Sequence, residues 1–118
     1  MSHDPTRDWL APRLRDTPSD LAGDILRLLD GVPASELEDP PRALAMAALA
    51  GFEEVVGGSG RRVEALRLLA ADAALTYAFE SAAERGTAPE LAEWIGLRGE
   101  LGRRLTSTPD ARGAGERT

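Results

Sequence analysis

The sequence predicts an all-α fold, a small bundle of four main helices with a short N-terminal helix and a disordered C-terminal tail. Apolar residues recur at helical spacing, and only two places, each shorter than four residues, alternate as a strand does. Ala and Leu together supply 37 of the 118 residues. Capping residues, prolines and glycines divide this helical pattern into five segments.

The first two expected helices are a short one over 5–15 and a longer one over 18–30. Pro12 lies inside the first helix, which is therefore expected to kink or end early. Thr17 is expected to cap the second helix, with Pro18 at its first position and Gly31 as its stop. The core-facing stripe of this second helix is Leu21, Ile25, Leu28 and Leu29.

The third expected helix begins after Asp39, an N-cap followed by two prolines, and runs to about Val56. A single turn capped by Ser35 precedes it. Its apolar side is expected to contain Leu44, Ala48, Phe52, Val55 and Val56. Further alanines make this helix slim enough for close packing, and the glycine-rich segment 57–60 ends it.

The fourth expected helix, 61–85, is the longest, at roughly 37 Å. One apolar face carries Val63, Leu66, Ala70, Ala73, Tyr77 and Ser81, and a second carries Leu68, Leu75 and Phe79. Two apolar faces are typical of a helix at the centre of a bundle or at a subunit contact. The candidate interface residues are therefore Leu68, Leu75 and Phe79 of this helix, together with Trp9 of the first helix. Gly86 is expected to end the fourth helix.

The fifth expected helix follows a capping box of Thr87 and Glu90 and runs to about Leu105. Its inward residues are Leu91, Trp94, Ile95, Leu101 and Leu105. We expect residues 1–105 to form a single domain and the polar segment 106–118 to be a disordered tail. An alanine-rich core buries little apolar area, which favours a dimer or a bound partner.

Composition excludes several classes of site. The chain has no Cys, which excludes a thiol nucleophile and a Cys-ligated zinc, and its one His is His3. We therefore expect no catalytic, cofactor-binding or metal-ligating residues and no cofactor. The net charge of −6 argues against a protein that binds nucleic acid, because such binding needs a basic surface. No apolar run is long enough for a membrane span and no signal-like segment opens the chain, so we expect a cytoplasmic protein.

The segment 57–62 leads into the long helix and is a candidate anion site. A helix N-terminus offers free N–H groups, glycines allow an anion to approach, and arginines add bidentate donors. The candidate residues are Ser59, Gly60, Arg61 and Arg62. The segment is not a Walker A loop, because it lacks Lys. The alternative is an interhelix hinge whose arginines meet Glu53 and Glu54.

Three carboxylates and two tryptophans have both a functional and a structural interpretation. Asp72, among apolar neighbours, is either a functional acid or a helix-edge residue paired with an Arg. Glu80 and Glu84 share a helix face, which suits either a metal site or a solvated surface. Trp94 is expected to pack in the core. Trp9 is expected to anchor its segment on the bundle or on another chain.

The segment 68–80 reads Leu-Leu-Ala-Ala-Asp-Ala-Ala-Leu-Thr-Tyr-Ala-Phe-Glu. It resembles the central helix of trans-type prenyl diphosphate synthases, where leucine-alanine-glycine-aspartate-alanine-leucine precedes an alanine-phenylalanine pair. Ala71 stands in place of that glycine, and the two aspartate-rich motifs of the family do not occur here. The resemblance implies a non-catalytic small subunit of a two-component prenyl synthase, with no catalytic residue carried over.

These observations lead us to expect a non-enzymatic helical protein that acts by association, as a homo-oligomer or as an accessory subunit. The alternative is an anion or isoprenoid-diphosphate binding module built on 57–62, or the non-catalytic synthase subunit. A DNA-binding helix-turn-helix is disfavoured, because no expected helix presents a basic, polar recognition face.

Overall fold

The computed structural model describes residues 4–58 and 62–106, with side chains for 4–58 and 64–98. Every regular element in these ranges is helical, which confirms the all-α class. In order, they are α1 (Pro5–Leu14), α2 (Ser19–Asp30), the 3₁₀ turn η1 (Ala34–Glu36), α3 (Pro40–Val56), α4 (Arg62–Arg85) and α5 (Ala88–Thr106). The chain divides into two compact units, Met1–Ala88 and Pro89–Thr118, which we describe separately. A single domain over 1–105 stays a prediction.

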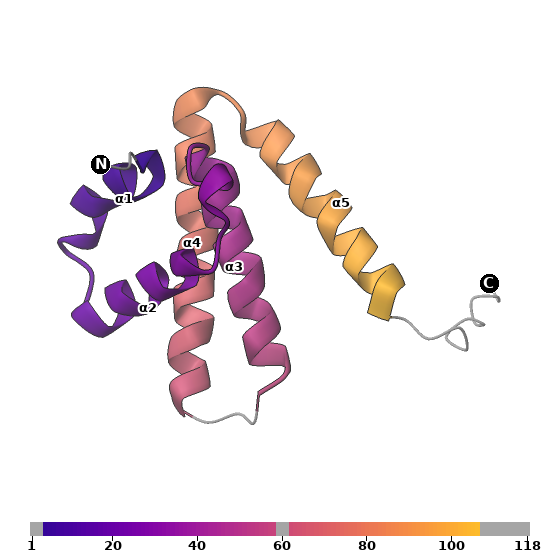
Figure 1. The fold of residues 1–118 in the computed structure, drawn as a ribbon, viewed down its shortest axis with the longest axis horizontal. Helices are drawn as coiled ribbons and strands as arrows, with labels where there is room; N and C mark the ends of the chain where they lie inside the picture. The colour runs from indigo at the N-terminus through magenta and orange to yellow at the C-terminus, as the bar shows by residue number, and fades with distance from the viewer. Residues whose placement is uncertain (1–3, 59–61, 107–118) are drawn as a thin grey trace. The chain divides into compact units, whose positions relative to one another are not determined.

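Helices α3 and α4 form the centre of the first unit. They lie side by side and antiparallel, and α2 packs against both (Figure 1). The three helices meet at Gly51, where a β-carbon would lie 2.8 Å from Cβ of Ala71 and 3.0 Å from Cδ1 of Leu28. Only a glycine fits this position at the present helix separation. The slim α3 expected from its alanines therefore does pack closely.

Helix boundaries follow the capping residues at three places. Asp39 caps α3, its carboxylate accepting a hydrogen bond from the N–H of Arg42 at 3.4 Å. Gly57 is the C-terminal cap of α3. Gly86, at φ 72°, ends α4 in a Schellman arrangement, with the N–H of Thr87 bound to the carbonyl of Ala82 at 2.8 Å. These local predictions were confirmed because each cap is complete within a few residues.

Two predictions for the first helices need revision. Thr17 does not cap α2, because its hydroxyl donates back to the carbonyl of Arg13 at 3.3 Å. Pro18 is the N-cap instead, with no side-chain hydrogen bond. Helix α1 continues through Pro12 and ends two residues later, at Leu14. Pro12 has no N–H to donate to the carbonyl of Asp8, and the helix ends within two residues of it.

The core takes its large side chains from α1 to α3 and small ones from α4. Leu10, Ile25, Leu29 and Leu44 are fully buried. The buried positions of α4 are Ala70, Ala71, Ala74, Ala78, Ser81 and Ala82. The expected inward face of α4 was therefore partly wrong, since Leu66, Ala73 and Tyr77 are only half-buried. Only small residues fit where α3 approaches closely, which accounts for Leu66 and Tyr77, whereas Ala73 lies about 100° around the helix from the buried Ala74.

The second unit contributes α5. Its Trp94 is half-buried, and the guanidinium of Arg98 lies 4.7 Å from the centre of its ring, a cation–π contact. Thr106, expected to start the tail, is the last residue of α5. The rest of the expected tail, 107–118, lies outside the described residues, as do the side chains of Leu101 and Leu105.

Candidate functional site

Large apolar side chains are exposed on α4. Leu68 is 44% exposed and Leu69 58% exposed, whereas Leu75 and Phe79 are half-buried. Leu68, Leu75 and Phe79 lie on one stripe, since steps of about seven and eleven residues return to the same side of a helix. The structure thus brings together three of the four candidate interface residues. We call Leu68, Leu69, Leu75 and Phe79 the leucine face.

Leu69 was missed by the sequence analysis, which assigned it to neither apolar face. Val56 was assigned wrongly: it is 86% exposed, although it was expected on the inward side of α3. It is the last residue of α3 and lies about 100° around the helix from Val55, turned away from the core. A helical-wheel count taken to the last residue would have separated the two valines.

Trp9 docks on α4 of its own chain. Its indole Nε1–H donates to Oε1 of Glu84 at 2.8 Å, and its ring meets Tyr77 edge to face, with centroids 6.2 Å apart. Trp9 is half-buried in this position. Of the two anchoring roles considered for Trp9, the structure shows docking within the chain. Tyr77 follows Leu68 by about two and a half helical turns, so Trp9 lies on the opposite side of α4 from Leu68, Leu75 and Phe79.

Arg13 joins α1 to the two carboxylates that the sequence singled out. Its Nε donates to Oε2 of Glu80 at 3.1 Å, and its Nη2 donates to Oε2 of Glu84 at 2.6 Å. Its guanidinium also stacks on the Trp9 ring, 3.6 Å from the centroid. Glu80 and Glu84 therefore bind an arginine and are not merely a solvated face. We call Trp9, Arg13, Tyr77, Glu80 and Glu84 the clamp.

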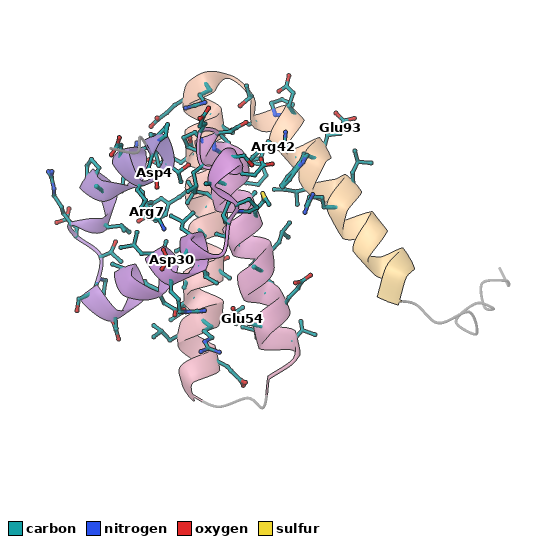
Figure 2. All side chains as sticks on the ribbon, viewed as in Figure 1. Asp4, Arg7, Asp30, Arg42, Glu54 and Glu93 are labelled. Carbon is teal, nitrogen blue, oxygen red and sulfur yellow. The ribbon has the colours of Figure 1, made fainter. Side chains whose placement is uncertain are left out.

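A second arginine ties α1 to α2. Arg7 binds Asp4 and Asp30, each at 2.6 Å (Figure 2). Asp4 is also the N-cap of α1, accepting the N–H of Arg7 at 3.0 Å. Burial raises the pKa of Asp4, but the hydrogen bonds and the charge of Arg7 outweigh this effect, so its pKa lies below the ordinary value.

A third ionic group connects α2, α3 and α4. Arg27 binds Asp24 at 2.7 Å and Glu54 at 3.0 Å, and Arg67 lies 3.8 Å from Glu54. The hydrogen bonds to Asp24 and Glu54 raise the pKa of Arg27. Glu54 was expected to meet the arginines at 61 and 62, and it is already bound from α2 and α4. This group stabilises the packing of the three helices.

The candidate anion site lies largely outside the described residues. This applies to Ser59, Gly60 and Arg61, and to the side chain of Arg62. At its described edge, the carboxylate of Glu64 lies so close to Gly58 that a β-carbon there would overlap it. A carboxylate in the first turn of α4 complements the helix dipole and competes with an incoming anion. Anion binding stays a prediction, tested by whether inorganic diphosphate raises the melting temperature.

The remaining candidate shows no specialised environment. Asp72 is exposed, and among the described residues it takes part in no ion pair, so the expected pairing with an Arg stays a prediction. In the described ranges, no three His, Cys, Asp or Glu side chains are grouped as metal ligands would be. No described helix is long and apolar enough to cross a membrane.

Comparisons of the chain with protein-family models, with curated proteins and with solved structures gave no match. The resemblance of 68–80 to prenyl diphosphate synthases therefore stays a prediction. In the structure, this segment supplies all four leucine-face residues and two clamp residues, Tyr77 and Glu80. The segment thus has a structural account that needs no diphosphate.

Proposed function

We propose that this chain is a non-enzymatic helical protein that acts by protein–protein association, and that the leucine face of α4 makes the contact. The observation that carries the proposal is the exposure of two adjacent leucines, Leu68 and Leu69, at 44% and 58%. Both lie well inside a 24-residue helix, as its seventh and eighth residues.

The composition of the core explains why association is favourable. The buried side of α4 is almost entirely alanine, so folding buries little apolar area from this helix. Complete burial of a leucine side chain contributes about 1.5–3 kcal/mol, and roughly half of that remains available at Leu68 and at Leu69. A contact over the leucine face would therefore bury apolar area that the alanine-rich core does not.

The test is sedimentation velocity of the full chain beside the variant Leu68→Ser/Leu69→Ser. Leu26→Ser is the matched control, because Leu26 is also exposed, at 36%, but lies on α2. We expect the wild type and the control to sediment as oligomers and the double variant as a monomer. That result identifies a second copy as the partner.

An accessory subunit gives a different pattern. The wild type is then a monomer alone, and the wild type and Leu26→Ser, but not Leu68→Ser/Leu69→Ser, retain one stoichiometric protein from the native host. If the wild type is a monomer and the double variant retains the same proteins as the wild type, the proposal is wrong. Circular dichroism of each variant establishes that loss of association is not loss of folding.

A further inference from the structure

Helix α1 is attached to the rest of its unit at two separate places. Near its start, Thr6 is buried, and its hydroxyl and N–H both donate to the carbonyl of Leu37, at 2.7 and 3.3 Å. One turn later, Leu10 is fully buried. Along the same face of α1, Trp9 and Arg13 reach α4 through the long side chains of the clamp. The first attachment is apolar and backbone-mediated, and the second is ionic.

The clamp is open to solvent. The side chains of Arg13, Glu80 and Glu84 are 27%, 46% and 49% exposed. Ion pairs at such exposure are weakened by dissolved salt, because mobile ions screen them over about 10 Å at 0.1 M. The hydrogen bond from Trp9 ends on Glu84, which also binds Arg13, and the guanidinium stacked on the Trp9 ring is that of Arg13. Screening therefore loosens all of the clamp together.

The stripe of α4 beneath the clamp contains an unsatisfied polar group. Tyr77, Ser81 and Glu84 follow one another at helical spacing, and the two outer residues contact Trp9. Ser81 is 1% exposed, and its hydroxyl has no hydrogen-bond partner. Opening of α1 would remove Trp9 from the two residues that flank Ser81 on this stripe.

The linker allows such an opening. Residues 15–18 join α1 to α2 without belonging to either helix. The only ion pair between the described parts of α1 and α2 is Arg7 with Asp30, and Asp30 is 75% exposed. These four residues are where the backbone angles would change if α1 moved, and movement of α1 as a unit would also break the bonds of Thr6 to Leu37 and expose Leu10.

We propose that α1 is a releasable strap whose opening is controlled by the clamp. Salt or loss of a clamp residue releases Trp9 and uncovers the Tyr77–Ser81–Glu84 stripe, while α2, α3 and α4 remain folded. The strap shares no residue with the leucine face: Leu68, Leu75 and Phe79 lie on the opposite side of α4 from Tyr77, and Leu69 lies about three turns before Glu80.

The experiment follows Trp9 alone. In a Trp94→Phe background of the full chain, Trp9 is the single tryptophan. Acrylamide, a neutral quencher, measures the access of solvent to its indole. Between about 0.05 and 1 M NaCl we expect the quenching constant to rise by roughly two- to fivefold, while far-UV circular dichroism is unchanged.

Two variants approach the clamp from opposite ends. Arg13→Gln on α1, and independently Glu80→Gln/Glu84→Gln on α4, should show the high-salt quenching constant already at low salt and lose the salt response. Arg15→Gln is the control, because Arg15 is an exposed arginine two residues from Arg13 and outside the clamp. If one clamp variant fails to fold, the other still tests whether the clamp controls the access of solvent to Trp9.

Two results would overturn the strap. One is a wild-type quenching constant that does not change with salt. The other is a urea titration in which Trp9 fluorescence and helical signal disappear together in the wild type and in both clamp variants. Either result means that α1 opens only when the whole unit unfolds.

Discussion

Gly51→Ala tests the close approach of α3 and α4. The new methyl group would lie 2.8 Å from Cβ of Ala71 and 3.0 Å from Cδ1 of Leu28. Carbon atoms in favourable contact are about 3.5–4.0 Å apart, so the two helices must separate by roughly 1 Å. Leu28 can rotate away, but Ala71 cannot, because its β-carbon is fixed to the backbone. Overpacking of this kind costs about 1–3 kcal/mol.

Replacing a helical glycine also has a favourable effect, of about 0.8–1 kcal/mol, because alanine is the better helix former. We therefore expect Gly51→Ala to be destabilised by about 0–2 kcal/mol. Gly23→Ala on α2 is the control, because a β-carbon at Gly23 meets nothing within 4 Å. It should be stabilised by about 0.5–1 kcal/mol.

The difference between these two variants isolates the packing cost from the backbone effect. We expect a difference of about 1–3 kcal/mol in the free energy of unfolding, measured by urea titration with circular dichroism. Gly51→Ala/Ala71→Gly returns the space to the interface and should recover most of the loss. If Gly51→Ala and Gly23→Ala are equally stabilised, α3 and α4 do not approach as closely as described.

Three further predictions concern single polar groups. Asp39→Ala removes the N-cap of α3 and should lower the free energy of unfolding by about 0.5–2 kcal/mol in a urea titration. Ser81→Ala removes a buried hydroxyl without a partner and should leave stability unchanged or raise it by up to about 1 kcal/mol in the same titration. The lowered pKa of Asp4 means that its charged form is favoured by folding, so its contribution to stability is fully present above the ordinary pKa of an aspartate. It is lost as pH falls through the folded-state pKa, and Asp4→Asn should flatten that part of the pH–stability curve.

The elements that the sequence predicted best are those whose cause is local. Asp39 with its two prolines starts α3, and Gly86 ends α4, because the bonds concerned join residues at most five apart. Thr17 had the right side chain for a cap, but its hydroxyl binds the carbonyl of Arg13. A capping pattern predicts which bond a residue can make, and the neighbouring helix decides which one it does make.

The candidate site was predictable on one side of α4 and not on the other. Leu68, Leu75 and Phe79 share a stripe that follows from helical spacing alone. The bonds from Arg13 to Glu80 and Glu84 join residues 67 and 71 positions apart. Nothing local to either carboxylate distinguishes an arginine partner from a metal ion or from water. Tertiary packing brings the clamp together, so pattern analysis could single out its carboxylates but not their partner.

The position of α4 between two chemically different surfaces makes the two proposals separable. Tyr77 and Glu84 lie about half a turn around α4 from Leu68, and Leu69 lies about three turns before Glu80, so the clamp and the leucine face share no side chain. Substitutions at sites without shared partners usually act additively. Leu68→Ser/Leu69→Ser should therefore change association and leave the salt response of Trp9 unchanged, and Arg13→Gln should do the reverse. If Arg13→Gln also changes the sedimentation of the chain, then release of α1 and association through α4 are coupled, and the strap is part of the mechanism by which the protein finds its partner.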